Sequence, residues 1–282
     1  RELFSAVPAV RLIAGTDAYA SLPQAIEEAL ATGDRFALLD RNDEAVYELH
    51  RAPDQTGVSR YVAITRGCEN FCSYCIVPYV RGPVRSRGEA SIIREISSLE
   101  RAGVREITLL GQNVIDFRDG SIDFVGLARR VLSETGIGRL RFLTSHPRDL
   151  SLEVFALMAE DPRLCSHIHL PVQSGNDRVL AAMNRGYTRA RFLALLEEAR
   201  GRVGDLAVTS DIIVGFPGES PREFEDTLDL VRRARFDSAF TFMYSPREGT
   251  AAASLSDDIP AAEKKRRLHV LNEAVKEERG RI

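Results

Sequence analysis

The chain has 282 residues, 44% of them hydrophobic, with 38 Lys and Arg against 41 Asp and Glu and a net charge of −3. This length and composition allow one large α/β domain or two small ones, and the slight acidity excludes a globally basic, nucleic-acid-binding surface. No stretch approaches the roughly 18 apolar residues of a membrane span, and none resembles a secretory signal, so we expect a cytoplasmic protein.

The first part of the chain, 1–55, differs in pattern from the remainder of the sequence. A short strand is predicted at 9–13 and an amphipathic helix at 22–31, and the turn-rich stretch 51–57 is typical of a linker. The chain opens on Arg1 instead of Met, within an apolar-rich segment. We therefore expect this part to be the remnant of a longer α/β domain.

From residue 61 onward the pattern alternates between strand and helix. Strands are predicted at 61–65, 106–110, 139–144, 167–172, 207–214 and 238–244. Helices are predicted at 89–102, 124–134, 152–159, 178–183, 189–200 and 222–234. Parallel strands need connections of about a dozen residues or more, so this alternation predicts a parallel sheet. Right-handed crossovers would curl the sheet into a partial barrel, and an open doubly wound sheet fits the periodicity as well.

Three cysteines, Cys68, Cys72 and Cys75, have the spacing C-x3-C-x2-C. A cuboidal 4Fe-4S cluster needs four ligands, which are normally Cys thiolates, so this loop leaves one iron open to a reacting molecule. A zinc site is the main alternative, but the neighbouring histidines His50 and His146 do not form the paired knuckles that zinc sites use.

A disulfide framework is the other alternative for the cysteines. Four cysteines in a chain of 282 residues, without a secretory segment, are more typical of a reducing compartment. The remaining one, Cys165, precedes an apolar stretch, where a lone cysteine is most often a small buried hydrophobe.

Polar and glycine-rich segments follow the predicted strands at their carboxyl ends. In barrel-like α/β folds reactive groups gather at these ends, where loops diverge while the sheet stays rigid. The segments are the cysteine loop, Gly111-Gln112-Asn113, Ser145-His146-Pro147, Gln173-Ser174-Gly175 and Gly215-Phe216-Pro217-Gly218-Glu219. Their regular placement predicts a single site at this end of the sheet.

The cysteine loop, from Arg66 to Gly82, together with 109–114, 169–177 and 211–219, resembles the radical S-adenosylmethionine methylthiotransferases. The resemblance implies a (β/α)6 partial barrel of the TIM-like type. It also implies that S-adenosylmethionine chelates the open iron through its amino and carboxylate groups, and that the reduced cluster breaks its S–C5′ bond. The protein then has to hold the sulfonium near the cluster and keep water away from the radical.

The same resemblance assigns cofactor-binding roles beside plainer structural ones. Tyr74 matches an aromatic position against the adenine and otherwise braces the loop. Gly111 and Gln112 match the segment that meets the methionine amino group. Ser145 is a further candidate. Gln173 and Ser174 are candidates for contacts with ribose or carboxylate groups, and Ile213 to Phe216 for an apolar wall against the adenine. For Gln173, Ser174 and 213–216, turn formation and core packing are equally good explanations. His146 and His169 can shuttle protons or make structural hydrogen bonds.

An arginine cluster follows the cysteine loop directly. Arg81, Arg85 and Arg87 would stand at the mouth of the barrel, where closely spaced arginines suit RNA phosphates. The alternative is a solvated loop with salt bridges to Glu89 and Glu95. By contrast, 264–267 is predicted to be the solvated face of an amphipathic helix after Pro260.

Finer motif detail is most similar to the bacterial branch of the family that methylthiolates N6-isopentenyladenosine in tRNA. The branches that act on threonylcarbamoyladenosine or on a ribosomal protein, and a different radical enzyme, are the alternatives. The resemblance implies tRNA and an electron donor such as flavodoxin or ferredoxin as partners of a monomer. It divides the chain into 1–55, a core at 56–255, and a helix at 256–282 leading to a missing RNA-binding TRAM domain. It also implies a second 4Fe-4S cluster whose ligands are absent here.

Overall fold

The computed structural model describes residues 2–40 and 57–280. The chain divides into two compact units, Arg1–Gln55 and Thr56–Ile282. The predicted linker at 51–57 lies almost wholly outside the described residues. In the described ranges no helix is long and apolar enough to cross a membrane.

The first unit contains two short parallel strands with a helix between them. Strands β1 (Leu12–Ala14) and β2 (Phe36–Leu38) pair in parallel, and helix α2 (Leu22–Thr32) connects them. A short helix, α1 (Glu2–Ala6), precedes them. The strand predicted at 9–13 begins later than expected, and β2 was not predicted, because three residues are too few for a periodic signal.

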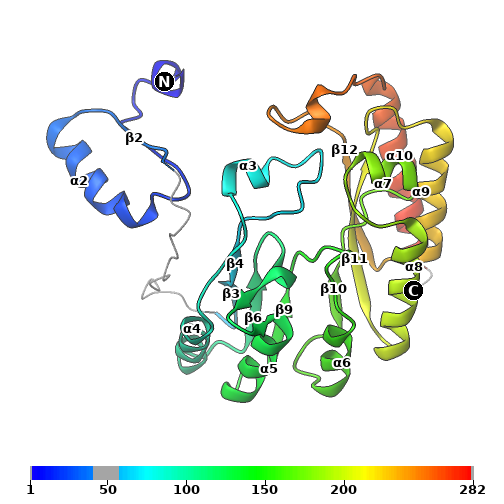
Figure 1. Cartoon of the computed structure of the whole chain (residues 1–282), viewed down its shortest axis with the longest axis horizontal. Helices are drawn as coiled ribbons and strands as arrows, with labels where there is room; N and C mark the ends of the chain where they lie inside the picture. The colour runs from blue at the N-terminus through cyan, green and yellow to red at the C-terminus, as the bar shows by residue number, and fades with distance from the viewer. Residues whose placement is uncertain (1, 41–56, 281–282) are drawn as a thin grey trace. The chain divides into compact units, whose positions relative to one another are not determined.

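The second unit is built on parallel strands that follow one another in chain order. One sheet has the order β3 (Ser59–Ala63), β6 (Glu106–Leu110), β9 (Arg139–Phe142), and the other has β10 (His167–His169), β11 (Ala207–Val214), β12 (Ser238–Met243). All neighbours are parallel. A backbone bridge links Leu140 of β9 to Leu164, three residues before β10, and the two sheets follow one another in one curved series (Figure 1). This confirms the predicted α/β partial barrel.

Helices follow the strands of this series, and the longer ones cover its outer face (Figure 1). They are α3 (Val77–Arg81), α4 (Glu89–Arg101), α5 (Phe124–Glu134), α6 (Glu153–Glu160), α7 (Asp177–Ala182), α8 (Arg189–Arg202), α9 (Pro221–Ala234) and α10 (Ala261–Arg279). Their apolar faces explain the burial of every second residue along β11. The predicted strand at 61–65 begins two residues earlier, and Thr65–Arg66 forms a separate strand, β4, antiparallel to β5 (Arg85–Ser86).

Helix α10 packs against β12 and α9 and so belongs to the same unit as the barrel. The prediction that 264–267 is a solvated surface is wrong for two of the four residues. Lys264 and Arg267 are only 6% and 2% exposed, because the helix turns them toward the barrel. Lys265 and Arg266 are exposed, as predicted.

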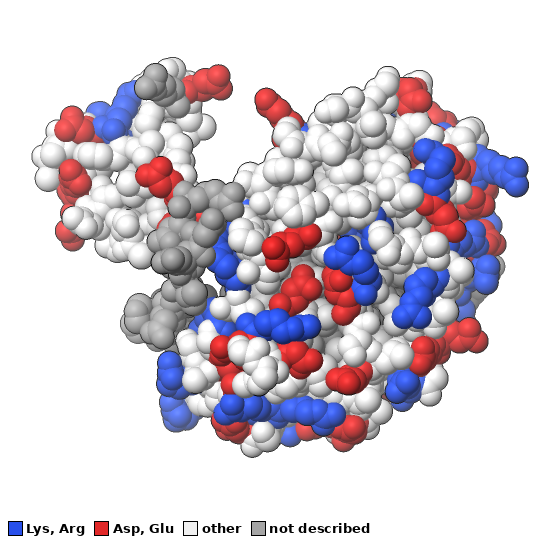
Figure 2. All heavy atoms as spheres, in the orientation of Figure 1, with Lys and Arg blue, Asp and Glu red and all other residues white. Residues whose placement is uncertain are grey.

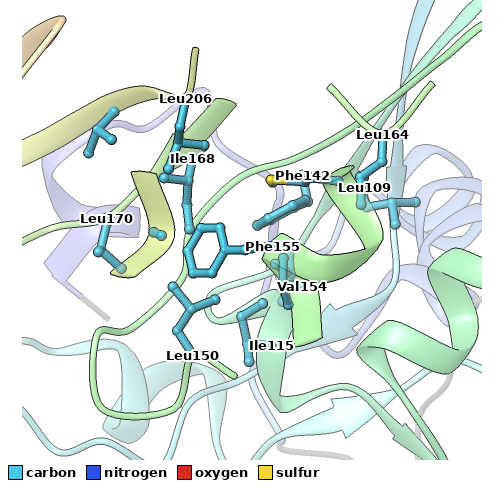
Figure 3. Packing of buried hydrophobic residues seen from close by; sticks show 14 of the residues in the cluster. Leu109, Ile115, Phe142, Leu150, Val154, Phe155, Leu164, Ile168, Leu170 and Leu206 are labelled. Atoms are coloured by element: carbon cyan, nitrogen blue, oxygen red, sulfur yellow. The ribbon is translucent and has the colours of Figure 1, made fainter. Parts of the chain in front are cut away.

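Phe155 of α6 lies where the two sheets meet. Its ring is fully buried among side chains from β9, β10 and the loops beside them, including Phe142, Ile168 and Leu170 (Figure 3). We expect Phe155→Ala to lower the free energy of unfolding by about 3–5 kcal/mol, since it leaves a cavity in a close-packed core. Urea unfolding followed by circular dichroism measures this. A loss below about 1 kcal/mol would contradict the packing of this ring.

Candidate functional site

The three cysteines share the loop between β4 and α3. Cys72 is buried and Cys68 and Cys75 are half-buried. Burial raises the pKa of the Cys68 and Cys75 thiols, and the neighbouring thiols of the loop raise both further. The three thiols thus share one short loop, in surroundings partly removed from water.

Gly67 holds the entry to this loop in a conformation that only glycine adopts without strain. Its φ is +82°, and a Cβ there would lie 1.9 Å from Pro83 O. Its amide donates to Gln112 Oε1 over 2.7 Å, and the next amide, of Cys68, donates to Gly82 O. The start of the loop is therefore fixed by the Gln112 side chain and by the Gly82 carbonyl.

We expect Gly67→Ala to reduce iron binding, because the added methyl group meets the Pro83 carbonyl and the left-handed conformation costs about 1–2 kcal/mol. Iron and sulfide per chain after anaerobic reconstitution measure the effect. Gly88→Ala is the matched control, since nothing lies within 4 Å of a Cβ at that position. Equal iron content in the two variants would contradict this role of Gly67.

A buried arginine, which sequence reasoning missed, contacts the loop. Arg185 is 4% exposed. Its Nη1 donates to Cys72 Sγ over 3.2 Å and to Tyr74 Oη over 3.4 Å, and its Nη2 donates to Pro171 O over 2.7 Å. Its Nε donates to Tyr187 Oη, which in turn donates to Val172 O. Arg185 thus connects the cysteine loop to the segment after β10.

The backbone on both sides of Arg185 has a left-handed conformation, and the Arg185 side chain is buried. Asn184 and Gly186 on either side have φ values of +57° and +71°, and Asn184 Nδ2 donates to Phe71 O over 2.9 Å. The Asn-Arg-Gly sequence was the available signal, because Asn and Gly are the residues that favour this left-handed conformation.

The segments predicted to gather at the carboxyl ends of the strands do lie there, but several of their groups already have partners. Gln112 uses its amide oxygen to hold Gly67. A Cβ at Gly111 would lie 1.9 Å from Thr65 Oγ1, so this glycine permits close packing. Ser145 donates to His169 O over 2.7 Å and thereby ties the end of β9 to β10. Ser174 accepts from the Asn176 amide and is fully buried.

Two buried amide oxygens at these ends have no hydrogen-bond partner within the described residues. They are Asn113 Oδ1, after β6, and Gln173 Oε1, after β10. The backbone of Gln173 has φ +71°, which is uncommon for a residue other than glycine. A buried acceptor without a partner is costly, so such atoms indicate a place where a donor group is expected.

The chain matches the sequence model of the radical SAM superfamily over residues 62–231. This chain belongs to the radical SAM superfamily. Two solved structures support the fold of the family: a radical S-adenosylmethionine methyltransferase from Kitasatospora setae and coproporphyrinogen III oxidase from Escherichia coli. The first has a TM-score of 0.56 at 18% identity over 68% of this chain and 38% of its own. The second has a TM-score of 0.55 at 20% identity, over 76% of this chain and 52% of its own.

Curated bacterial relatives are much more similar in sequence. One from Moorella thermoacetica is 48% identical over 271 residues, which is 94% of this chain and 61% of the relative. One from Syntrophomonas wolfei is 52% identical over 219 residues, or 77% of this chain and 49% of the relative. Both carry the name tRNA-2-methylthio-N(6)-dimethylallyladenosine synthase. The chain thus spans about three fifths or less of the length of these two relatives.

The donor set fits the cluster that the radical SAM superfamily implies. Within 2–40 and 57–280 no three His, Cys, Asp or Glu side chains converge as ligands of one metal ion. The ligands of a cuboidal cluster bind different irons and stand farther apart than the ligands of one ion. Arg185 is a buried cation beside the cysteine loop. A buried charge is costly unless it has a partner of opposite sign, and thiolates that bind a cluster supply that negative charge.

Tyr74 and Phe216 of this radical SAM core belong to one apolar cluster. Phe216 is fully buried and packs with Val179, Met183, Tyr244 and Ala252, while Tyr74 and Ile213 lie against the same group. Their assignment to the adenine side of the cofactor stays a prediction. The structure adds that this group links the cysteine loop to the turn after β11.

The two candidate histidines have different surroundings. His146 is buried, and burial together with Arg185 and Arg148 lowers its pKa to about 2, so its ring is neutral at any physiological pH. His169 lies 3.3 Å from Asp211 and 3.0 Å from Thr209 Oγ1. His146 Nδ1 accepts from the Arg148 amide over 3.2 Å, so both rings make structural contacts beside any role in proton transfer.

The arginine cluster after the loop is divided by burial. Arg87 is 8% exposed, pairs with Glu95 at 2.7 Å and donates to Ala63 O, so its guanidinium is held inside the protein. The prediction that Arg87 contacts RNA is therefore wrong. The predicted salt bridge of this loop to Glu95 is present. Glu89 pairs with Arg130 instead. Arg81 and Arg85 are half-buried. On the face shown in Figure 2, acidic and basic side chains are interspersed.

Cys165 is half-buried, and all four cysteines are free thiols. Its sulfur lies 3.9 Å from Arg163 O, on the segment that bridges the two sheets. This location agrees with a packing role and keeps Cys165 outside the candidate site.

Proposed function

We propose that this chain is the radical SAM core of a tRNA methylthiotransferase that places a methylthio group on C2 of N6-dimethylallyladenosine, also called N6-isopentenyladenosine. The observation that carries the proposal is sequence identity of 48%, 46% and 44% to three relatives of that name, over 94%, 98% and 97% of this chain. The cysteine loop and the strand-end segments lie within the aligned core.

The residues present fit the expected cofactors. Cys68, Cys72 and Cys75 would hold the 4Fe-4S cluster and leave one iron for S-adenosylmethionine. When bound, the pair supplies one-electron cleavage of the sulfonium. Gln173 and Asn113 offer buried oxygens to donor groups of S-adenosylmethionine. The buried cluster of Phe216, with Tyr74 against it, excludes water from behind the cysteine loop.

Arg185 has two tasks in this proposal. It fixes the position of Cys72 Sγ by a direct hydrogen bond, and it provides positive charge beside a negatively charged cluster. Because Arg185 is buried, this charge is little screened by solvent.

The partners follow from the same proposal. The substrate is tRNA, with Arg81 and Arg85 as the phosphate contacts that remain after Arg87 is withdrawn. A one-electron carrier such as flavodoxin or ferredoxin reduces the cluster, and the setting is the cytoplasm. A second 4Fe-4S cluster would supply the sulfur; the described cysteines of this chain do not provide three further ligands for it.

The test has two arms. The 282-residue chain is reconstituted anaerobically with iron and sulfide, reduced with dithionite and assayed for 5′-deoxyadenosine formed from S-adenosylmethionine. In the second arm, the gene that encodes the chain is expressed in a bacterium lacking its own methylthiolating enzyme, and the tRNA nucleosides are analysed by mass spectrometry. We expect 5′-deoxyadenosine in the first arm. In the second arm we expect 2-methylthio-N6-isopentenyladenosine only where the expressed protein also carries the ligands of the second cluster, and none from the 282-residue chain by itself.

Other outcomes separate the alternatives. A colourless protein that binds zinc and forms no 5′-deoxyadenosine would overturn the radical mechanism. A methylthio group on threonylcarbamoyladenosine or on a ribosomal protein would replace the proposed substrate. Radical formation without sulfur incorporation in cells, from a protein that carries the ligands of both clusters, would indicate a different radical SAM reaction.

A further inference from the structure

The turn after β11, residues 215–219, is held from behind by the carboxyl-terminal helix α10. Arg267 of α10 forms an ion pair with Glu219, with Nη1 2.7 Å from Oε2, and the two side chains are 3% and 0% exposed. The same Nη1 donates to Glu219 O over 2.8 Å. Arg267 Nε also donates to Glu263, one turn earlier on α10. A buried pair of this kind is sensitive to the loss of either partner.

Glu219 passes this restraint to the start of the turn. Its Oε2 accepts from the Gly215 amide over 2.7 Å, so one carboxylate closes the turn on itself and joins it to Arg267. Gly215 has φ +69°, and a Cβ there would lie 2.6 Å from Lys264 Cγ. The backbone of the turn therefore lies directly against the stem of a second α10 side chain.

Lys264 fixes the other side of the turn. Its Nζ lies 2.7 Å from Asp257 Oδ2 and donates to Tyr244 O over 3.4 Å. The ammonium also lies 5.2 Å from the centre of the Tyr244 ring. Because the Tyr244 amide donates to Val214 O, Lys264 holds the end of β12 beside the end of β11.

Phe216 connects this restrained turn to the cysteine loop. Its ring meets Tyr244 edge to face at 5.3 Å and packs in the apolar cluster against which Tyr74 lies. Backbone hydrogen bonds continue the connection: Ala252 donates to Ser73 O over 2.7 Å, and Ser73 donates to Met183 O over 3.0 Å. A displaced turn would move the Phe216 ring and, with it, the group that backs Tyr74.

We propose that Arg267 is a positioning residue for S-adenosylmethionine: it acts through Glu219 and the 215–219 turn on the buried Phe216 cluster, against which the partly buried Tyr74 and Ile213 lie. The proposal rests on the proposed function in one respect, that this chain binds S-adenosylmethionine beside the cysteine loop. It makes α10 a functional part of the pocket. Neither Arg267 nor Lys264 touches the cofactor in this proposal.

The test compares Arg267→Gln with two matched variants on the same helix. Arg266→Gln removes an exposed arginine that also pairs with Glu263. Leu271→Ala removes a fully buried apolar side chain of α10 that belongs to the main core cluster and not to the cluster of Phe216. Equilibrium dialysis with reconstituted protein, well below the melting temperature of each variant, gives the affinity for S-adenosylmethionine. Hydrogen exchange at the Gly215 amide, without cofactor, gives the state of the turn.

We expect Arg267→Gln to weaken S-adenosylmethionine binding by about tenfold or more, with the iron content unchanged and with faster exchange at Gly215. Arg267→Lys should recover part of the affinity, because it keeps the charge and loses the forked geometry. Arg266→Gln and Leu271→Ala should bind as the wild type does.

Three results would overturn the inference. Wild-type affinity in Arg267→Gln would do so directly. An equal loss of affinity in Leu271→Ala would reduce the role of Arg267 to general stability. A wild-type chain that holds its cluster and does not bind S-adenosylmethionine would overturn the proposed function and this inference with it. Hydrogen exchange at Gly215 distinguishes failure of the proposed function from failure of this inference, because it measures the Arg267 restraint without any cofactor present.

Discussion

Alanine at Cys68, Cys72 or Cys75 is expected to remove the iron-sulfur absorption at about 400 nm and the cleavage of S-adenosylmethionine together. Two thiolates cannot hold a cuboidal cluster that has only three protein ligands, so the loss should be complete in each variant. Absorption spectroscopy after reconstitution and chromatography of 5′-deoxyadenosine measure the two effects.

Cys165→Ala is the control for these variants. This residue is a half-buried free thiol outside the loop, so its replacement should leave both signals intact. Two results would contradict the ligand assignment: a full cluster in any of the three loop variants, or loss of the cluster in Cys165→Ala alone.

The second large effect is expected for Arg185→Met. The change removes the donor to Cys72 Sγ and leaves Pro171 O, which now accepts from Arg185 Nη2, without that partner. Truncating one member of a buried, hydrogen-bonded charged contact costs about 2–5 kcal/mol. If the whole of this cost falls on the transition state, the rate of 5′-deoxyadenosine formation falls by about 30-fold to 5,000-fold.

The reduction potential separates this role from a purely structural one. A buried positive charge stabilises the reduced, more negative cluster, so its removal should make the potential more negative. A redox titration followed by electron paramagnetic resonance measures the shift. Arg185→Lys should restore much of the potential and little of the Cys72 geometry, because lysine supplies the charge without the fork. An unchanged potential and rate in Arg185→Met would contradict both tasks.

The strands and helices of the barrel could be predicted because their signals are local. Helix α5 lies at the predicted positions, and β6 and β11 have the predicted bounds, since apolar periodicity and turn residues are read within one element. The prediction failed where an element is very short, as in β2, or where an extended segment divides, as between β3 and β4.

The contacts of the site were harder to predict because they join distant parts of the chain. Arg185 and Cys72 are 113 positions apart, and nothing in the sequence near either residue indicates that they meet. Lys264 and Arg267 lie in a charged run whose composition is typical of a solvated face. Only the packing of α10 against the barrel decides which two side chains of the run 264–267 are buried.

The order of the strands also bears on how the protein is made. Because β3, β6 and β9 pair in the sequence in which they are synthesised, and β10, β11 and β12 repeat this pattern, each new strand finds its neighbour already present. Domains tend to fold from the amino-terminal end as the ribosome releases them. We therefore expect the first three strands to pair while the later ones are still being translated, which shortens the time that an unpaired sheet edge is open to aggregation.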